Sequence, residues 1–395
     1  MKKFLNYRFR VYLAIALISL FTGCTWQQES GKANNKIVDV IDLKNAQNYI
    51  SLDLKEIIKD VQGIPLQSGS GILIKEIDKI IEYKNKFFVL DRFQSQGVFA
   101  FKNNGEFIYK INTIGKEPGS IMYPLDIIID SAQENLIVLD NDNRRINFYD
   151  ANTGKFKHSV RNKMPATRFK QIKSGGWWFT GGNSPSNITL VDDNFNRLMN
   201  FMNKEPGRPK TVYQSFLSVG DTLDMFIRNY CDTIFRIDGD KIFAYRKIKF
   251  NQEDSTTFID TTYNYADIIK AFPNRKFLYK YYFENNAHIF FTYIEKSNLT
   301  GVVYNKKNKK IISFPVENCN TNALFLNAFP VIVSVGNDGN FIAVGDGDNF
   351  ANISKDPSSG SLFGLFNNKN SLLLNIKKDS PVFRHNPVLI KFNFQ

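Results

Sequence analysis

The chain has 395 residues, with 51 Lys and Arg against 38 Asp and Glu, which gives a formal net charge of +13. The basic residues are dispersed along the chain and no nucleic-acid recognition motif accompanies them, so we expect no nucleic-acid partner. After residue 24 no segment offers 18 consecutive apolar residues, which excludes a membrane-spanning helix there. The excess charge indicates a basic surface that favours acidic partners.

Residues 1–24 have the pattern of an export signal. Four cations precede an apolar run of 11 residues, Val11 to Phe21, which suits a signal peptide and is too short to span a bilayer. The run leads into "TGC", and the small residue before Cys24 resembles the lipobox of bacterial lipoproteins, in which cleavage leaves that cysteine as a lipidated N-terminus. Phe21 stands where Leu is usual in this motif, so an ordinary secretory signal is the alternative.

Lipidation of Cys24 would anchor the protein without a spanning helix, because each buried CH₂ contributes about 0.8 kcal/mol. Thr25 follows the cysteine in place of Asp, which in Gram-negative sorting indicates the outer membrane. Residues 25–36 are polar and predict a tether, and residues 37–395 predict one domain. The sequence leaves both a periplasmic and a surface-facing orientation open.

Two consecutive segments, residues 86–111 and 135–160, align without a gap at an offset of 49 residues. Each copy contains four short runs of β-branched and aromatic residues separated by Asn, Asp and Gly. Four strands in roughly 50 residues are typical of one blade of a β-propeller.

Fainter copies of the same unit continue to the end of the chain. They lie at residues 175–201, 223–248, 287–314 and 331–350, the last completed by 387–394. The sequence therefore predicts an all-β fold, a six-bladed β-propeller with four-stranded antiparallel blades. Closing the ring requires an N-terminal segment, residues 37–43 or 50–54, to join the last sheet and remove its open edge. An α/β enzyme would need long helical patterns between the strands, and the chain has only short ones.

Turn residues recur at equivalent places in the two aligned copies. Gly105 and Gly154 lie in the hairpins "KNNGEF" and "ANTGKF", where we expect positive φ. Asp91 and Asp140 end equivalent strands, and a repeated position favours turn capping over an acid–base pair.

The tetrapeptide "KEPG" occurs twice, each time between the outer strand of one blade and the inner strand of the next. If the turn starts at the Glu of this tetrapeptide, Pro occupies its second position and Gly its third, which suits a type II turn. Such connections lie on the face over the central channel, where propellers usually bind ligands. Four residues of these turns are therefore candidate ligand-binding residues: Lys116, Glu117, Lys204 and Glu205.

Five stretches carry a resemblance to a known family: "IPLQ" (64–67), "KFFVLDR" (86–92), "FAFKNNGEFIYKINTIGKEPGS" (99–120), "NYCDTIFRIDGD" (229–240) and "NPVLIKFNF" (386–394). The chain resembles the six-bladed β-propeller lipoproteins, related to NHL-repeat propellers, of Gram-negative gut anaerobes, which are mostly of unknown function. In that family the blade-linking loop commonly reads G-x-G-P-G-E-Y, and Ser120 replaces the Glu here. The resemblance implies a fold and an envelope location, and no established activity.

Few residues point to catalysis or metal binding. His158, His288 and His385 lie far apart without a motif, so we expect no catalytic triad, no metal and no cofactor. "GDGDN" (345–349) has Asp-x-Asp spacing but lacks the 12-residue calcium pattern and its final Glu. Cys231 and Cys319 are expected to be buried thiols, with a disulfide as the alternative in an oxidising envelope.

Trp177 and Trp178 are a further pair of candidate ligand-binding residues. Adjacent residues of a strand point to opposite faces of the sheet, so we expect one ring to pack between blades. The other is either packed as well or exposed, and an exposed ring could stack on a sugar or an aromatic ligand.

Two functional classes follow from these observations. The favoured one is a membrane-anchored envelope lipoprotein whose propeller face binds a glycan, a peptide or a protein partner without catalysis. The alternative is an enzyme that uses the propeller channel, such as a calcium-dependent lactonase or a polysaccharide lyase. The enzyme requires acidic or His side chains from several blades to converge on the axis.

Overall fold

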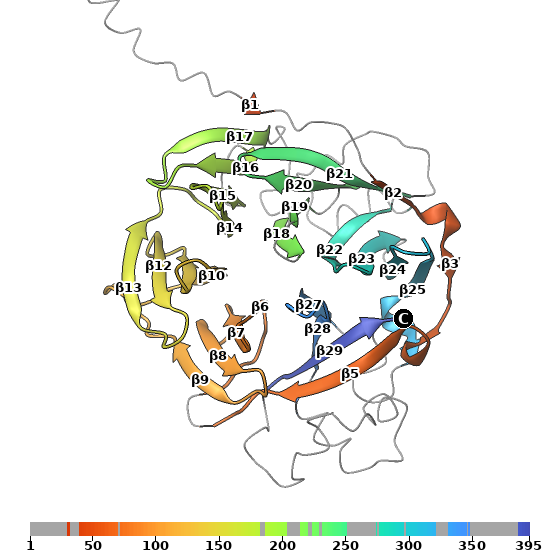
Figure 1. Ribbon diagram of the computed structural model, residues 1–395, viewed down its shortest axis with the longest axis horizontal. Coiled ribbons are helices and arrows are strands. Elements are labelled where there is room, and N and C mark those ends of the chain that lie inside the picture. Colours follow the sequence, from red (N-terminus) through yellow and green to blue (C-terminus); the bar gives the residue numbers. More distant parts are fainter. Residues whose placement is uncertain are drawn as a thin grey trace, which may run out of the picture.

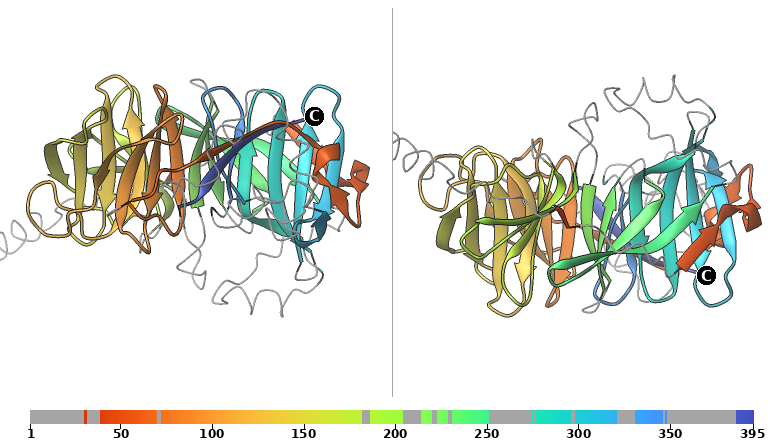
Figure 2. Two further views of the ribbon diagram at one scale, coloured as in Figure 1. Left: turned by 90° about the horizontal axis from the view of Figure 1, so that it is seen from below. Right: turned by 90° about the horizontal axis from the view of Figure 1, so that it is seen from above.

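The computed structural model describes residues 30–31, 39–69, 72–181, 186–203, 214–219, 223–228, 231–250, 274, 276–295, 298–320, 331–345, 347 and 386–395. These residues form six blades around a central axis (Figure 1), and the strands of each blade run between the two faces of the ring (Figure 2). The predicted all-β, six-bladed β-propeller with four-stranded antiparallel blades is confirmed.

Blades one to three are each built from strands that are consecutive in the chain, from the axis outward. Blade one contains β6 (Lys79–Tyr83), β7 (Lys86–Asp91), β8 (Gly97–Lys102) and β9 (Phe107–Ile111). Blade two contains β10 (Pro124–Asp130), β11 (Asn135–Asp140), β12 (Arg145–Asp150) and β13 (Phe156–Arg161). Blade three contains β14 (Arg168–Gln171), β15 (Trp177–Thr180), β16 (Ser186–Val191) and β17 (Arg197–Asn203).

Blades four and five follow the same pattern, and blade six combines the two ends of the domain. Blade four contains β18 (Gln214–Val219), β19 (Leu223–Arg228), β20 (Thr233–Asp238) and β21 (Lys241–Lys249). Blade five contains β22 (Phe277–Glu284), β23 (His288–Glu295), β24 (Asn298–Asn305) and β25 (Ile311–Pro315). Blade six contains β27 (Val331–Val335), β28 (Phe341–Gly345), β29 (Val388–Phe394) and β5 (Ile58–Pro65).

A hydrophobic core lies between each pair of neighbouring blades, so a blade buries both of its faces. In β7, Phe87 and Val89 belong to the core shared with blade six, whereas Phe88 and Leu90 belong to the core shared with blade two. All four side chains are at most 1% exposed. Burial on both faces explains why "KFFVLD" is a continuous apolar run rather than an alternating one.

The predicted turn chemistry is confirmed in blades one and two. Gly105 and Gly154 have φ of +85° and +71°. A Cβ on Gly105 would collide with the carbonyl oxygen of Pro65, and one on Gly154 would collide with the ring of Tyr109. Each hairpin therefore packs tightly against the outer strand of the preceding blade, which only glycine permits.

The predicted capping role of the two aspartates is also confirmed. The Asp140 carboxylate accepts hydrogen bonds of 3.0 Å from the backbone N–H groups of Met122 and Tyr123. The Asp91 carboxylate accepts a bond of 3.0 Å from the N–H of Lys75. Both aspartates are fully buried and tie the connection that enters their blade to the end of its second strand.

Ring closure uses a different N-terminal segment from those predicted. β5 pairs antiparallel with β29 and forms the outer strand of blade six, so neither residues 39–43 nor residues 50–54, the described parts of the two predicted segments, close the ring. The physical reason is length: β29 has seven residues and β5 has eight, whereas β2 (Asp39–Asp42) and β4 (Leu52–Asp53) have four and two. Only β5 can pair with the whole of β29.

The segment before β5 runs along the outside of the ring (Figure 1). β2 pairs in parallel with β21 of blade four, and β3 (Gln47–Asn48) pairs in parallel with β25 of blade five. β4 pairs with β26 (Cys319–Asn320). Within the predicted tether, β1 (Ser30–Gly31) pairs with β17 of blade three, and the rest of residues 25–36 lies outside the described residues. None of the helices in the described part of the chain is long and apolar enough to cross a membrane.

Candidate functional site

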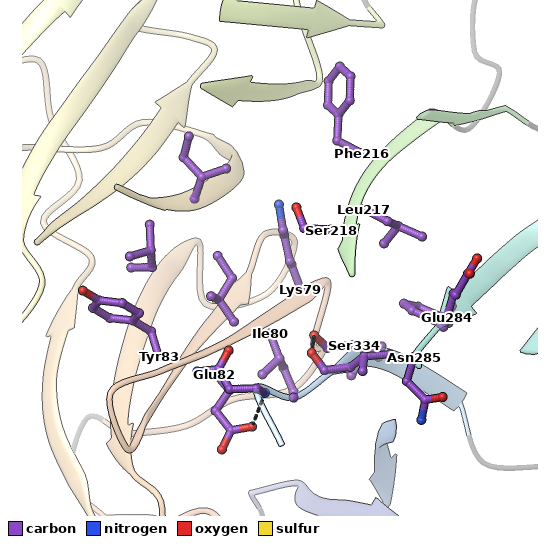
Figure 3. A pocket seen from close by; sticks show the side chains of 18 of the residues that line it. Lys79, Ile80, Glu82, Tyr83, Phe216, Leu217, Ser218, Glu284, Asn285 and Ser334 are labelled. Atoms are coloured by element: carbon purple, nitrogen blue, oxygen red, sulfur yellow. Dashed lines mark hydrogen bonds between the residues drawn. The ribbon is translucent and has the colours of Figure 1, made fainter. Parts of the chain in front are cut away.

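The innermost strands of the six blades enclose a channel of about 740 Å³. Every blade contributes side chains to it, and Figure 3 shows residues from several blades converging on one space. The lining includes two groups of charged side chains. It also includes these apolar residues: Ile80, Ile81, Ile128, Phe169, Phe216, Leu217 and Val333. We call the two ends of the channel the basic mouth and the acidic mouth after the charged residues described next.

The basic mouth consists of Lys79, Arg168 and Lys170. Lys79 and Arg168 are the first residues of β6 and β14, and Lys170 is the third residue of β14. The ammonium of Lys79 donates to the Asp126 carboxylate at 2.7 Å, and the other oxygen of Asp126 accepts the N–H of Phe169 at 3.1 Å. Because Asp126 bonds to both residues, it holds Lys79 beside the first residues of β14, and its carboxylate is buried, with 1% of the residue exposed. Burial lowers the pKa of Lys79, which the Asp126 carboxylate partly offsets.

The other two cations of the basic mouth are held differently from each other. Lys170 pairs with Asp224 at 2.8 Å and donates to the hydroxyl of Ser218 at 2.9 Å. Nη1 of Arg168 donates to the backbone carbonyls of Leu125 and Thr167 at 2.7 and 2.8 Å. Among the residues that the structure describes, no carboxylate lies within ion-pair distance of Arg168.

Asp78 is the one acidic side chain among the described lining residues at the basic mouth, and it is already engaged. Its carboxylate pairs with Arg92 at 3.1 Å and accepts the Arg92 N–H at 2.7 Å. Burial raises the pKa of Asp78 above its ordinary value.

The acidic mouth consists of Glu82, Glu284 and Asp338, which lie at or beyond the ends of β6, β22 and β27. Lys391 of β29 is 5% exposed and pairs with Glu82 at 3.0 Å and with Asp338 at 2.6 Å. Both carboxylates on this side therefore share one lysine, and the group of three side chains keeps an excess negative charge.

Glu284 belongs to a buried network between blades four and five. Its carboxylate pairs with Arg246 of β21 and with Lys306, both at 2.5 Å, and accepts the Tyr282 hydroxyl at 2.7 Å. Arg246 in turn pairs with Asp39 of β2 at 2.8 Å. Burial raises the pKa of Tyr282 well above its usual range, and the Glu284 carboxylate adds to this shift.

Lys116 and Glu117 lie where the sequence predicted, on the connection from blade one to blade two, and both are exposed. Gly119 has φ of +83° and the Ser120 N–H bonds to the Glu117 carbonyl at 3.0 Å, so the type II turn is confirmed. Arg145 of blade two donates to the carbonyl of Lys116 and fixes the turn. Neither Lys116 nor Glu117 lines the channel.

Trp177 and Trp178 point to opposite faces of blade three, as predicted, and the exposed alternative is wrong. Trp177 is 4% exposed in the core with blade two, and Trp178 is fully buried in the core with blade four. The indole N–H of Trp178 donates to the carbonyl of Gly239 at 2.9 Å. Because blade three has a neighbour on each side, neither ring can stack on an external ligand here.

Several predicted residues lie outside the described part of the chain: Cys24, Lys204, Glu205, His385 and most of 345–349. Cys231 is a free, half-buried thiol, and the side chain of Cys319 is not among those that the structure describes. His158 stacks on Phe148, and His288 is buried with Nε2 near the backbone carbonyl of Gln395. No cluster of three or more His, Cys, Asp or Glu side chains able to hold a metal occurs among the described residues.

Sequence reasoning missed the charged side chains of the channel because it placed the site on loops. The signal was present in the inner-strand sequences "DKIIEY" and "TRFKQI", where charged residues interrupt strands at the axis of the ring. Charged side chains on the most interior strands of a propeller need a partner or a cavity.

The fold is shared with solved structures of Bacteroides proteins. A Bacteroides fragilis protein named as exported has a TM-score of 0.67 and 15% identity, with 90% of this chain and 99% of that chain covered. A member of the duf4221 family from Bacteroides vulgatus has a TM-score of 0.51 and 11% identity, with 86% and 98% covered. No curated protein matches the sequence.

One family matches most of the chain. Its description is "Domain of unknown function (DUF4934)", and the match covers residues 38–393, which include all six blades. The predicted resemblance to a propeller family of unknown function is thereby confirmed, and the chain belongs to the DUF4934 family.

Proposed function

We propose that the protein is a non-enzymatic binding module of the bacterial cell envelope and that its ligand binds in the central channel. The observation that carries this proposal is the channel itself, which is lined by all six blades and holds about 740 Å³. Small-molecule sites typically measure about 300–1,000 Å³ and combine apolar walls with a few polar groups. The channel has both properties.

The walls of the channel are fixed by ion pairs between neighbouring blades. Lys79 and Asp126 join blades one and two, and Lys391 and Glu82 join blades six and one. A pre-formed wall lowers the entropy that a ligand must lose to bind. The arrangement therefore suits recognition of a ligand by a rigid site.

The proposed location rests on the N-terminal sequence. The signal pattern and the lipobox-like "TGC" support a lipid on Cys24 and an outer-membrane position. The fold neighbour from Bacteroides fragilis, which is named as exported, supports an envelope location. Metabolic labelling with palmitate tests the anchor, and Cys24→Ala should lose the label and move the protein from the membrane fraction to the soluble fraction. Label that persists in Cys24→Ala contradicts the anchor.

Ligand binding can be tested with residues 25–395, the mature chain without its lipid. Thermal unfolding is recorded against glycans, peptides and divalent metals, each with and without chelator. A ligand at a hundred times its dissociation constant stabilises the protein by about 2.7 kcal/mol. Ser334→Trp is the matched variant, because Ser334 lines the channel and its hydroxyl bonds only to the neighbouring Val335 carbonyl among the described residues.

Ser334→Ala is the control, because it removes the hydroxyl without filling the channel. A compound that stabilises the wild type and Ser334→Ala but not Ser334→Trp supports binding in the channel. Stabilisation that survives Ser334→Trp places the ligand elsewhere and contradicts the proposal. A calcium-dependent rise that chelator reverses would favour the lactonase or lyase alternative. No response to any compound would contradict a small ligand and direct the search to a protein partner.

A further inference from the structure

The basic mouth holds three cations on two inner strands, and one of them is unpaired among the described residues. Lys79 and Lys170 each have a carboxylate partner, Asp126 and Asp224. Arg168 has none, and its guanidinium is held only through Nη1 by two backbone carbonyls. Arg168 is half-buried and is one of the residues that line the channel.

The three cations raise one another's electrostatic energy. Burial lowers the pKa of Lys79, and the positive charges of Arg168 and Lys170 lower it further. Figure 3 shows the Lys79 amine directed into the channel, so the field of the cluster is felt in the cavity rather than only inside the wall. An anion placed there would relieve this repulsion.

We propose that the basic mouth binds the carboxylate of a small ligand, with Arg168 as the forked hydrogen-bond donor and Lys79 and Lys170 as flanking positive charges. A guanidinium presents two parallel N–H groups that match a carboxylate, and such charge-assisted bonds are stronger than neutral ones. This inference rests on the proposed function, because it assigns a ligand class to the same channel.

The rest of the channel fixes the orientation of the ligand. Phe216 and Leu217 border the cavity in blade four, where they can contact an apolar or sugar-ring portion. The far end carries the carboxylates of Glu82, Glu284 and Asp338. Like charges repel, so the ligand carboxylate is excluded from the acidic mouth and the uncharged end of the ligand points toward it.

The test is calorimetric titration of the mature chain at pH 7 and low salt with sodium D-glucuronate, hexanoate and inorganic phosphate, and with D-glucose as the uncharged match of glucuronate. The carboxylates should bind and glucose should bind at least about tenfold more weakly, as expected for the loss of a charged hydrogen-bonded pair. Arg168→Gln should weaken carboxylate binding about tenfold or more. Arg168→Lys should lose less carboxylate affinity, because it keeps the positive charge but not the two parallel N–H groups of the guanidinium.

Lys84→Gln is the control within the same channel. Lys84 also lines the cavity, but it follows β6, at the end where the acidic mouth lies, and pairs with Glu134. Lys84→Gln removes one positive charge, as Arg168→Gln does. If binding depends on the site rather than on net charge, the carboxylate affinity of Lys84→Gln should stay within about twofold of the wild-type value. If Arg168→Gln fails to fold, Lys170→Gln replaces it, since Asp224 keeps its bond from Ser218 in that variant.

Three outcomes overturn the inference. In the first, the carboxylates bind no more tightly than glucose, or do not bind at all. In the second, Arg168→Gln and Lys84→Gln lose the same amount of carboxylate affinity. The third is phosphate binding without carboxylate binding. An uncharged ligand that binds the wild type but not Ser334→Trp would leave the channel proposal standing while this inference fails. Binding of every ligand that persists in Ser334→Trp contradicts both.

Discussion

The two mouths of the channel are both charged, and they differ in how the charges are used. At the acidic mouth, Glu82, Glu284 and Asp338 each have a cationic partner within 3.0 Å. At the basic mouth, Arg168 has no carboxylate partner among the described residues. Removing one member of a buried pair leaves an uncompensated charge, so the paired mouth is needed by the fold. An unpaired cation at a cavity wall is available to a ligand.

Replacing Arg246 by Met should cause the largest loss of stability in this comparison. Arg246 is 3% exposed, and the Glu284 side chain that it contacts is fully buried. The variant leaves Lys306 as the one cation paired with Glu284 among the described residues and takes Arg246 away from Asp39, so we expect the free energy of unfolding to fall by about 3 kcal/mol. Urea unfolding measures this change.

The double variant Arg246→Met/Glu284→Gln separates charge from packing. It removes both buried charges and leaves Lys306, whose side chain is 24% exposed and can reach water. We expect it to unfold at a higher urea concentration than the single variant. If the single and double variants unfold at the same urea concentration, the loss of stability comes from packing, and the charges do not stabilise the acidic mouth.

Replacing Lys391 by Met should have the next largest effect. The side chain of Glu82 is 13% exposed and that of Asp338 is 46% exposed, so solvent screens both partners better than it screens Glu284. We expect a loss of about 2 kcal/mol by urea unfolding. Lys102→Met is the control, because solvent screens the exposed pair of Lys102 with Glu106 and its loss should destabilise the protein much less. Equal losses in the two variants would contradict a structural role for Lys391.

The acidic mouth should also respond to acid through Asp338. Burial alone would raise the pKa of Asp338, but the hydrogen bonds from Lys391 and Asn340, together with the positive charge of Lys391, outweigh burial, so the pKa lies below the ordinary value of 3.8. The folded state therefore binds this proton less readily than the unfolded state, so the stabilisation is present above pH 3.8 and is lost as pH falls through the folded pKa. Asp338→Asn should be less stable than the wild type at pH 6, and the gap should narrow between pH 5 and pH 3. A gap that does not change with pH would contradict the role of the charge.

The parts of the molecule that sequence could predict are those that depend on neighbours in the chain. Gly105 and the turn at Glu117 were identified because their backbone geometry is set within a few residues, and Asp140 was identified because it repeats the position of Asp91 in the preceding copy. The mouths of the channel depend on pairs that no local pattern connects: Lys391 and Glu82 are 309 residues apart, and Arg246 and Asp39 are 207 apart. Trp178 was ambiguous for the same reason, since its burial requires the adjoining blade.

Among the substitutions at the two mouths, Arg168→Gln should have the smallest effect on stability, which makes it the sharpest test of the comparison. The change removes two hydrogen bonds to the carbonyls of Leu125 and Thr167, one of which the Gln amide can restore, and it leaves no carboxylate without its partner among the described residues. We expect the free energy of unfolding to fall by about 1 kcal/mol or less in urea. A loss as large as that of Lys391→Met would show that Arg168 also holds the fold together, and the two mouths would then not differ. A small loss of stability combined with a large loss of carboxylate affinity would separate the two roles, because a residue that only supports the structure cannot change binding without changing unfolding.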